Sequence, residues 1–172
     1  MPINHATPFA DLTEAQYSAL GKVVVEWANI ECLLGVLLGR LLLTPEYLGR
    51  TYAAGMTAVR LQSAITEAVS IHRHRYRAKR VAEDTLKLIE SLNARVSSLR
   101  ANRNKISHFC WARWSDDEIF GTALAGGVPD PKWERRTNAR LELGELKTLH
   151  QEAYGLTEEL LRITQALPKV DG

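Results

Sequence analysis

Cysteine and long hydrophobic runs are both scarce in this sequence of 172 residues. Its two cysteines, Cys32 and Cys110, lie in apolar surroundings of helical spacing, where a free cysteine acts as a small hydrophobic residue. The most apolar run, residues 32–43, is too short to span a bilayer and is interrupted by Arg40. Residues 1–10 lack the cationic start and apolar core of a signal peptide. We therefore expect a soluble, cytoplasmic protein with no membrane partner.

A strong excess of charge of one sign is also missing. Lys and Arg number 22 against 20 Asp and Glu, and this net charge of +2 is too small to argue for nucleic acid by itself. Hydrophobic residues make up 45% of the chain and charged residues 24%, which is typical of globular proteins. Length and composition predict one folded domain over residues 1–172, with an irregular N-terminus over residues 1–12.

Capping signals and helical spacing predict several helices. Thr13 and Gln16 form a capping-box pattern at the start of a long helix, which Thr44 and Pro45 end before a short second helix. Further helices are expected over about residues 57–74, 80–108 and 143–167. The residues expected to face the core are Leu20, Val24, Trp27, Ile30, Leu34, Leu37, Leu38 and Leu41, then Val59, Leu61, Ile65, Val69 and Ile71, then Val81, Leu88, Leu92, Val96, Leu99 and Ile106, and finally Leu146, Leu149, Leu156, Leu160 and Ile163.

Residues 110–141 interrupt the helical pattern. The turn-forming residues among their short β-prone pieces are Gly121, Gly126, Gly127, Pro129 and Pro131. The predicted fold is therefore all-α, an up-and-down bundle of four or five helices with a short β-like hairpin insert before the last helix. Trp111, Trp114 and Trp133 frame the insert, and we expect them to pack it onto the bundle rather than to line a ligand groove.

A polar strip lies near the end of the helix predicted to finish at His108. At about 100° per residue, Arg103 falls at the edge of the apolar stripe, and Ser107, Arg100, Asn104 and His108 follow at roughly 40°, 60°, 100° and 140°. Asn104 and His108 are four residues apart, so the amide can orient the imidazole. Arg100 and Ser107 are predicted to bind substrate beside them.

These residue types supply what metal-free phosphodiester cleavage needs. Arg103 offers a planar fork for phosphate oxygens, and the imidazole of His108 can move a proton near neutral pH. The imidazole would deprotonate a ribose 2′-hydroxyl or protonate the leaving 5′-oxygen, and only RNA carries that internal nucleophile. RNA is therefore the predicted substrate.

The two residues are badly placed for one phosphorus if they come from the same helix. They differ by about 140° around the helix axis and by about 7.5 Å along it. Two copies that meet about a two-fold axis would bring both arginines and both histidines into a shared cleft. We therefore expect a homodimer through this helix.

The segment Arg103-Asn104-x-x-x-His108 resembles the Arg-x(4–6)-His motif of HEPN domains. The resemblance extends to a first helix with Trp27 and Glu31, a β-like insert and a closing helix. It implies an all-α dimer, catalytic roles for Arg103, Asn104 and His108, and a metal-independent endoribonuclease without cofactor. Such enzymes often belong to toxin–antitoxin or antiphage systems, so an antitoxin protein is a further expected partner.

Two alternatives stay open. The same cleft could belong to a non-catalytic helical module that binds a nucleotide, RNA or a partner protein, as some HEPN domains do. Otherwise Arg103 pairs with an acid such as Glu31, and His108 is an ordinary helix-end residue favoured by the helix dipole.

Residues 71–80 form a second feature, rich in cations. Arg73, Arg75 and Arg77 are predicted to hold an RNA backbone, and Tyr76 to stack on a base. A solvated corner between two helices explains the run equally well.

No set of residues has the spacing of a metal site. His72 and His74 face different sides of a helix, and neither a CxxC pattern nor a second histidine pair accompanies His108 and Cys110. We therefore predict no metal ligands.

Overall fold

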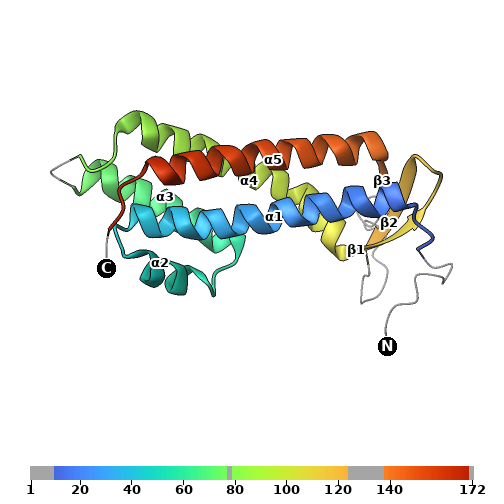
Figure 1. Ribbon diagram of the computed structural model, residues 1–172, viewed down its shortest axis with the longest axis horizontal. Coiled ribbons are helices and arrows are strands. Elements are labelled where there is room, and N and C mark those ends of the chain that lie inside the picture. Colours follow the sequence, from blue (N-terminus) through green and yellow to red (C-terminus); the bar gives the residue numbers. More distant parts are fainter. Residues whose placement is uncertain (1–9, 77–78, 124–137, 171–172) are drawn as a thin grey trace, which may run out of the picture. The chain divides into compact units, whose positions relative to one another are not determined.

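The structure is a computed structural model that describes residues 10–76, 79–123 and 138–170 (Figure 1). The elements within these ranges are α1 (Glu14–Leu41), α2 (Glu46–Ala53), α3 (Ala58–His74), α4 (Glu83–His108), β1 (Phe109–Arg113), β2 (Glu118–Ala123), β3 (Asn138–Glu142) and α5 (Leu143–Ala166). The predicted all-α class with a β insert before the last helix is confirmed. In these ranges no helix combines the length and apolar character needed to cross a membrane.

The insert lies where it was predicted, but in the described residues it has three strands rather than the two of a hairpin. β1, β2 and β3 form an antiparallel sheet in that order, in which Trp111 lies opposite Gly121 and Gly121 lies opposite Ala139. β3 pairs with β2 and leads directly into α5. The predicted turn residues Gly126, Gly127, Pro129 and Pro131, and also Trp133, lie outside the described residues.

Most helix ends follow the predicted local signals. The backbone N–H of Thr13 donates to Oε1 of Gln16 at 2.9 Å, and the N–H of Gln16 donates to Oγ1 of Thr13 at 3.2 Å, so the capping box is confirmed. Pro45 directly precedes α2 as its N-cap. The start predicted near residue 80 is too early, because α4 begins at Glu83 with Glu83 and Asp84 in its first turn, where acidic side chains complement the helix dipole.

The end of α1 is a Schellman motif with an unusual central residue. The N–H of Thr44 donates to the carbonyl of Gly39, and the N–H of Leu43 donates to the carbonyl of Arg40. Leu43 occupies the left-handed position with a φ of 52°, where glycine is the usual residue. The turn therefore carries a conformational cost that a glycine would avoid.

The chain divides into two compact units. Unit 1 comprises Met1–Val25 and Ala101–Glu152, and unit 2 comprises Glu26–Arg100 and Ala153–Gly172. The division falls within α1, α4 and α5, so each of these helices contributes a segment to both units.

Unit 2 is helical. α3 and α4 run antiparallel, because Gln62 on α3 bonds Asn93 on α4 whereas Arg73, further along α3, bonds Glu83 and Glu90 earlier on α4. α2 approaches α1 through glycines, and a Cβ added to Gly49 would lie 2.9 Å from the Cα of Gly39. The largest fully buried side chains of this unit are Trp27, Ile30, Leu34, Leu37, Leu38, Leu41, Ile65, Leu86, Ile89 and Leu92.

Four residues predicted to face the core are exposed instead: Val24, Val59, Ile71 and Leu88. In α1 the neighbouring Val23 is buried in place of Val24, and in α4 both Leu86 and Ile89 are buried on either side of Leu88. A shift of one residue turns a side chain by about 100° around the helix. The predicted helices are therefore correct, but the predicted direction of the side chain is wrong at these four residues.

Unit 1 holds the sheet against helix ends. Ile119 of β2 is fully buried, and the indole of Trp111 lies over Gly121, where an added Cβ would come within 2.6 Å of the ring. The side-chain amide of Gln16 donates to the carbonyls of Ser115 and Asp116 in the β1–β2 connection. These contacts fix the strands that follow α4 directly.

Candidate functional site

The predicted catalytic residues lie on the last turns of α4. Arg103 is half-buried, whereas Asn104 and His108 are exposed. Between them Ile106 is buried, and its carbonyl accepts a hydrogen bond of 3.0 Å from the indole N–H of Trp111. This contact anchors the helix end, so the polar side chains project from a fixed backbone.

Asn104 contacts the arginine of the motif. Nη1 of Arg103 donates to Oδ1 of Asn104 at 3.3 Å, which restricts the orientation of the guanidinium. The contact between Asn104 and His108 that their spacing allows stays a prediction. Ser107, the predicted substrate-binding neighbour, is exposed on the same helix end.

Arg100, the other predicted neighbour, belongs to unit 2 and bonds α3. Its Nη1 donates to Oε1 of Gln62 at 2.8 Å. Gln62 is itself buried and bonds Asn93 twice. Its Nε2 donates to the backbone carbonyl of Asn93, and Nδ2 of Asn93 donates to the backbone carbonyl of Gln62. Contact with RNA would require Arg100 to share its guanidinium with this network.

The cationic run after α3 is partly neutralised. All three guanidinium nitrogens of Arg73 donate to carboxylates: Nε to Glu83 at 2.9 Å, and Nη1 and Nη2 to Glu90 at 2.6 and 2.8 Å. The hydrogen bonds from Arg73 lower the pKa of Glu90, and the bond to Glu90 raises the pKa of Arg73. Binding of phosphate by Arg73 would have to displace this two-pronged ion pair.

The other members of the cationic run differ in their surroundings. Arg75 is exposed at the C-cap of α3, and Arg77 lies outside the described residues. Tyr76 is 39% exposed and packs on His72, with 4.9 Å between ring centroids. His72 is buried and its Nε2 lies 2.7 Å from the Leu41 carbonyl, so this histidine belongs to the core of unit 2.

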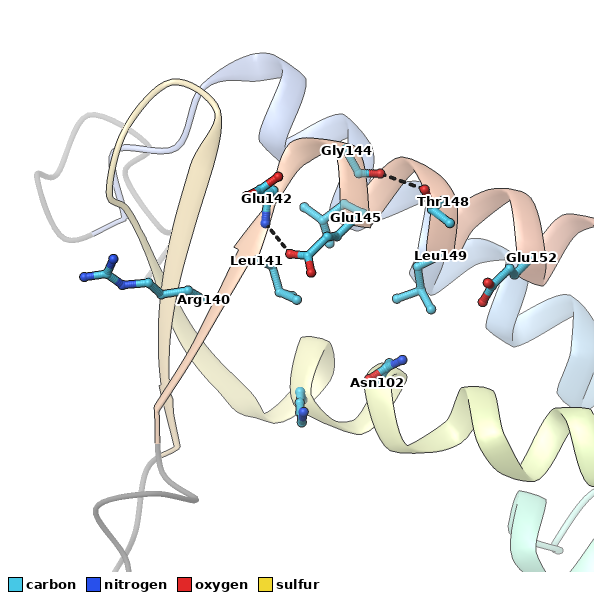
Figure 2. Close-up of a pocket in the computed structure, with 11 residues that line it drawn as sticks. Asn102, Arg140, Leu141, Glu142, Gly144, Glu145, Thr148, Leu149 and Glu152 are labelled. Atoms are coloured by element: carbon cyan, nitrogen blue, oxygen red, sulfur yellow. Dashed lines mark hydrogen bonds between the residues drawn. The ribbon is translucent and has the colours of Figure 1, made fainter.

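A pocket of about 630 Å³ lies beside the motif in unit 1 and was missed by the sequence reasoning (Figure 2). Its walls come from α4, β3 and the first turns of α5. The residues that line it are Asn102, Lys105, Arg140, Leu141, Glu142, Gly144, Glu145, Leu146, Thr148, Leu149 and Glu152. Arg103, Asn104 and His108 are not among them.

The side chains of the pocket have distinct orientations. Figure 2 shows Leu149 and Glu152 directed from α5 toward α4, with Asn102 facing them. Arg140 projects away from the pocket, and its guanidinium carbon lies 4.1 Å from the ring centre of Trp114. The spacing of Asn102 and Lys105 on α4 predicts a shared face, but nothing in the sequence indicates that β3 and α5 close the other sides.

The tryptophans of the insert behave differently from one another. Trp111 packs against Gly121 within the sheet and donates to the Ile106 carbonyl of α4, so this tryptophan ties the insert to the helix. Trp114 is 57% exposed and is covered in part by Arg140. In the part of the chain that the structure describes, no three His, Cys, Asp or Glu residues are grouped closely enough to hold a metal ion.

In comparisons with known proteins, the chain matches no family model, no curated protein and no solved structure.

Proposed function

We propose that this protein is a metal-independent endoribonuclease of the HEPN type. The observation that carries the proposal is the fixed end of α4, where the half-buried Arg103 bonds Asn104 while Asn104 and His108 are exposed to solvent. An oriented guanidinium and an accessible imidazole on the same helix end supply the two groups that metal-free phosphodiester cleavage needs. No cofactor enters this mechanism.

The reaction is an internal transesterification. Arg103 binds the non-bridging phosphate oxygens and stabilises the charge that develops on them. The ribose 2′-oxygen loses its proton and bonds to phosphorus, while the 5′-oxygen of the next nucleotide leaves and takes up a proton. His108 transfers one of these protons, and solvent water exchanges the other. The products are a 2′,3′-cyclic phosphate and a 5′-hydroxyl.

The proposal includes a homodimer through the motif helix. Arg103 and His108 project from one helix about 140° apart, so the arginine of one copy and the histidine of the other would share a phosphate. A nuclease that cuts cellular RNA requires control, and we therefore include an antitoxin protein as the partner, in a cytoplasmic toxin–antitoxin or antiphage system.

Purified protein incubated with structured RNA and EDTA tests the chemistry. We expect fragments with 2′,3′-cyclic phosphate ends, and a loss of rate by about 10²- to 10⁴-fold in His108→Ala. His74→Ala is the matched control, because His74 is likewise exposed at the last residue of a helix. Undiminished cleavage by His108→Ala would contradict the proposal.

The dimer has its own test. Arg103→Ala and His108→Ala should each be inactive, and a mixture of the two should form heterodimers with one intact Arg103–His108 pair. Partial recovery of cleavage in the mixture is expected. If subunits exchange but activity does not return, the shared cleft is wrong.

The half-buried Arg103, held by Asn104, also fits a second candidate function, a non-catalytic helical module that binds a nucleotide, RNA or a partner protein through the same cleft. This candidate predicts binding without turnover. Arg103→Ala would then weaken binding, while His108→Ala would leave it nearly unchanged.

A further inference from the structure

We propose that the pocket between α4, β3 and α5 binds a guanine base. The inference rests on the proposed ribonuclease function only for its link to RNA cleavage, to which it adds selection of the nucleotide. The binding itself follows from the shape and chemistry of the pocket.

The pocket has the size and floor that a flat ring needs. Its volume of about 630 Å³ lies within the range of small-molecule sites, which is roughly 300–1,000 Å³. Leu141 is half-buried and Leu149 is 8% exposed, and these two side chains give an apolar surface over the fully buried Leu146. Arg140 also lines the pocket, and its guanidinium is held over the ring of Trp114 rather than over these leucines.

Carboxylates from α5 lie on one side of this apolar surface, and the side-chain amide of Asn102 from α4 lies on the other. Glu145 and Glu152 are seven residues apart and share one face of α5. Oε2 of Glu145 already accepts from the N–H of Glu142 at 2.7 Å. Glu152 is directed toward α4 and presents a carboxylate opposite Asn102 (Figure 2).

Guanine fits this arrangement better than the other RNA bases. Its Watson–Crick edge carries two adjacent donors, N1–H and the 2-amino group, which match the two oxygens of one carboxylate. Adenine and cytosine each present a ring-nitrogen acceptor beside the amino group, and uracil has a donor between two carbonyls. A carboxylate would therefore meet at least one repelling acceptor on each of these bases. The amide of Asn102 can donate to the guanine carbonyl.

The pocket is also placed to act with the motif. Asn102, Lys105 and His108 follow one another at intervals of three residues on α4, so each is turned by about 60° from the last and moved by about 4.5 Å along the axis. Asn102 of the pocket and His108 are therefore about 120° apart around the axis and about 9 Å apart along it, with Lys105 between them. Lys105 lies between base and imidazole, where its ammonium suits a phosphate.

Calorimetric titration of the His108→Ala protein with GMP and AMP tests the site without turnover. We expect GMP to bind at least about tenfold more tightly than AMP. Glu152→Gln should remove this preference, whereas Lys105→Ala should weaken both nucleotides alike. Glu67→Gln, an exposed glutamate on α3, is the control and should change neither.

Equal affinity for GMP and AMP, or binding of neither, would overturn the inference. So would binding of an arginine-containing tripeptide in place of GMP, because it would assign the carboxylates to a protein partner. If GMP binds selectively but the wild-type protein cuts no RNA, the nuclease proposal alone fails. If RNA is cut without any bias toward guanine and GMP does not bind, the pocket proposal alone fails.

Discussion

Replacing Gln16 by glutamate should destabilise unit 1, because the buried amide of Gln16 both caps α1 and binds the β1–β2 connection. Oε1 of Gln16 accepts from the N–H of Thr13, which caps α1. Its Nε2 donates to the carbonyls of Ser115 at 2.8 Å and Asp116 at 3.1 Å, and the residue is wholly buried. Glutamate keeps the shape and the capping acceptor, but its second oxygen would face two carbonyl oxygens.

The expected loss in the free energy of unfolding at pH 7 is about 3–5 kcal/mol. Two hydrogen bonds contribute about 1 kcal/mol each, and burying a carboxylate against carbonyl dipoles accounts for the rest. Burial and repulsion raise the pKa of the introduced glutamate above its ordinary value of about 4.3. A raised folded-state pKa means that the loss is complete above that pKa and shrinks as the pH falls through it.

Urea unfolding followed by circular dichroism at pH 7 and pH 5 measures this difference against the wild-type protein. Gln151→Glu, an exposed glutamine on α5, controls for the added charge and should change stability little. A loss below about 1 kcal/mol in Gln16→Glu at pH 7 would refute the assigned role of the amide. A loss that does not shrink at pH 5 would refute the electrostatic part.

Three further substitutions test packing and backbone strain through thermal unfolding. Gly121→Ala should cost about 1–3 kcal/mol, because its Cβ would lie 2.6 Å from the Trp111 ring. Gly49→Ala should also lower the melting temperature despite the better helix propensity of alanine, because its Cβ would meet the Gly39 backbone at 2.9 Å. Leu43→Gly should stabilise the protein by up to about 1 kcal/mol by relieving the φ of 52°. A stabilising effect of either alanine, or a destabilising effect of Leu43→Gly, would contradict the steric and backbone arguments for that position.

Elements set by local chemistry were predictable from the sequence. The capping box of Thr13 and Gln16 lies within one helical turn, so four consecutive residues suffice to predict the start of α1. The sequence did not predict which of Leu88 and Ile89 faces the core. Both residues are apolar, and tertiary contacts select which of them is buried. β3 contains no β-branched residue, and its pairing with β2 rather than its own propensity makes it a strand.

The candidate site was predictable only where it lies on one helix. The motif residues share the end of α4, and their order along the chain sets their relative directions. The role of Arg73 was hidden, because its partner carboxylates are 10 and 17 residues away and meet it only when α3 and α4 pack antiparallel. The pocket was hidden for the same reason, since its walls combine α4 with segments more than 30 residues further along the chain.

The two proposals together predict which chain supplies each part of the site. Lys105 and His108 share a helix face, so the base would be selected by the chain that contributes the histidine, whereas Arg103 would come from the other copy. In heterodimers of Arg103→Ala and His108→Ala chains, the restored site uses the pocket of the Arg103→Ala chain. Adding Glu152→Gln to that chain should abolish the preference for guanine, measured as the sequence at the cut sites. Adding it to the His108→Ala chain should leave the preference intact, and the reverse result would place base and imidazole on different copies.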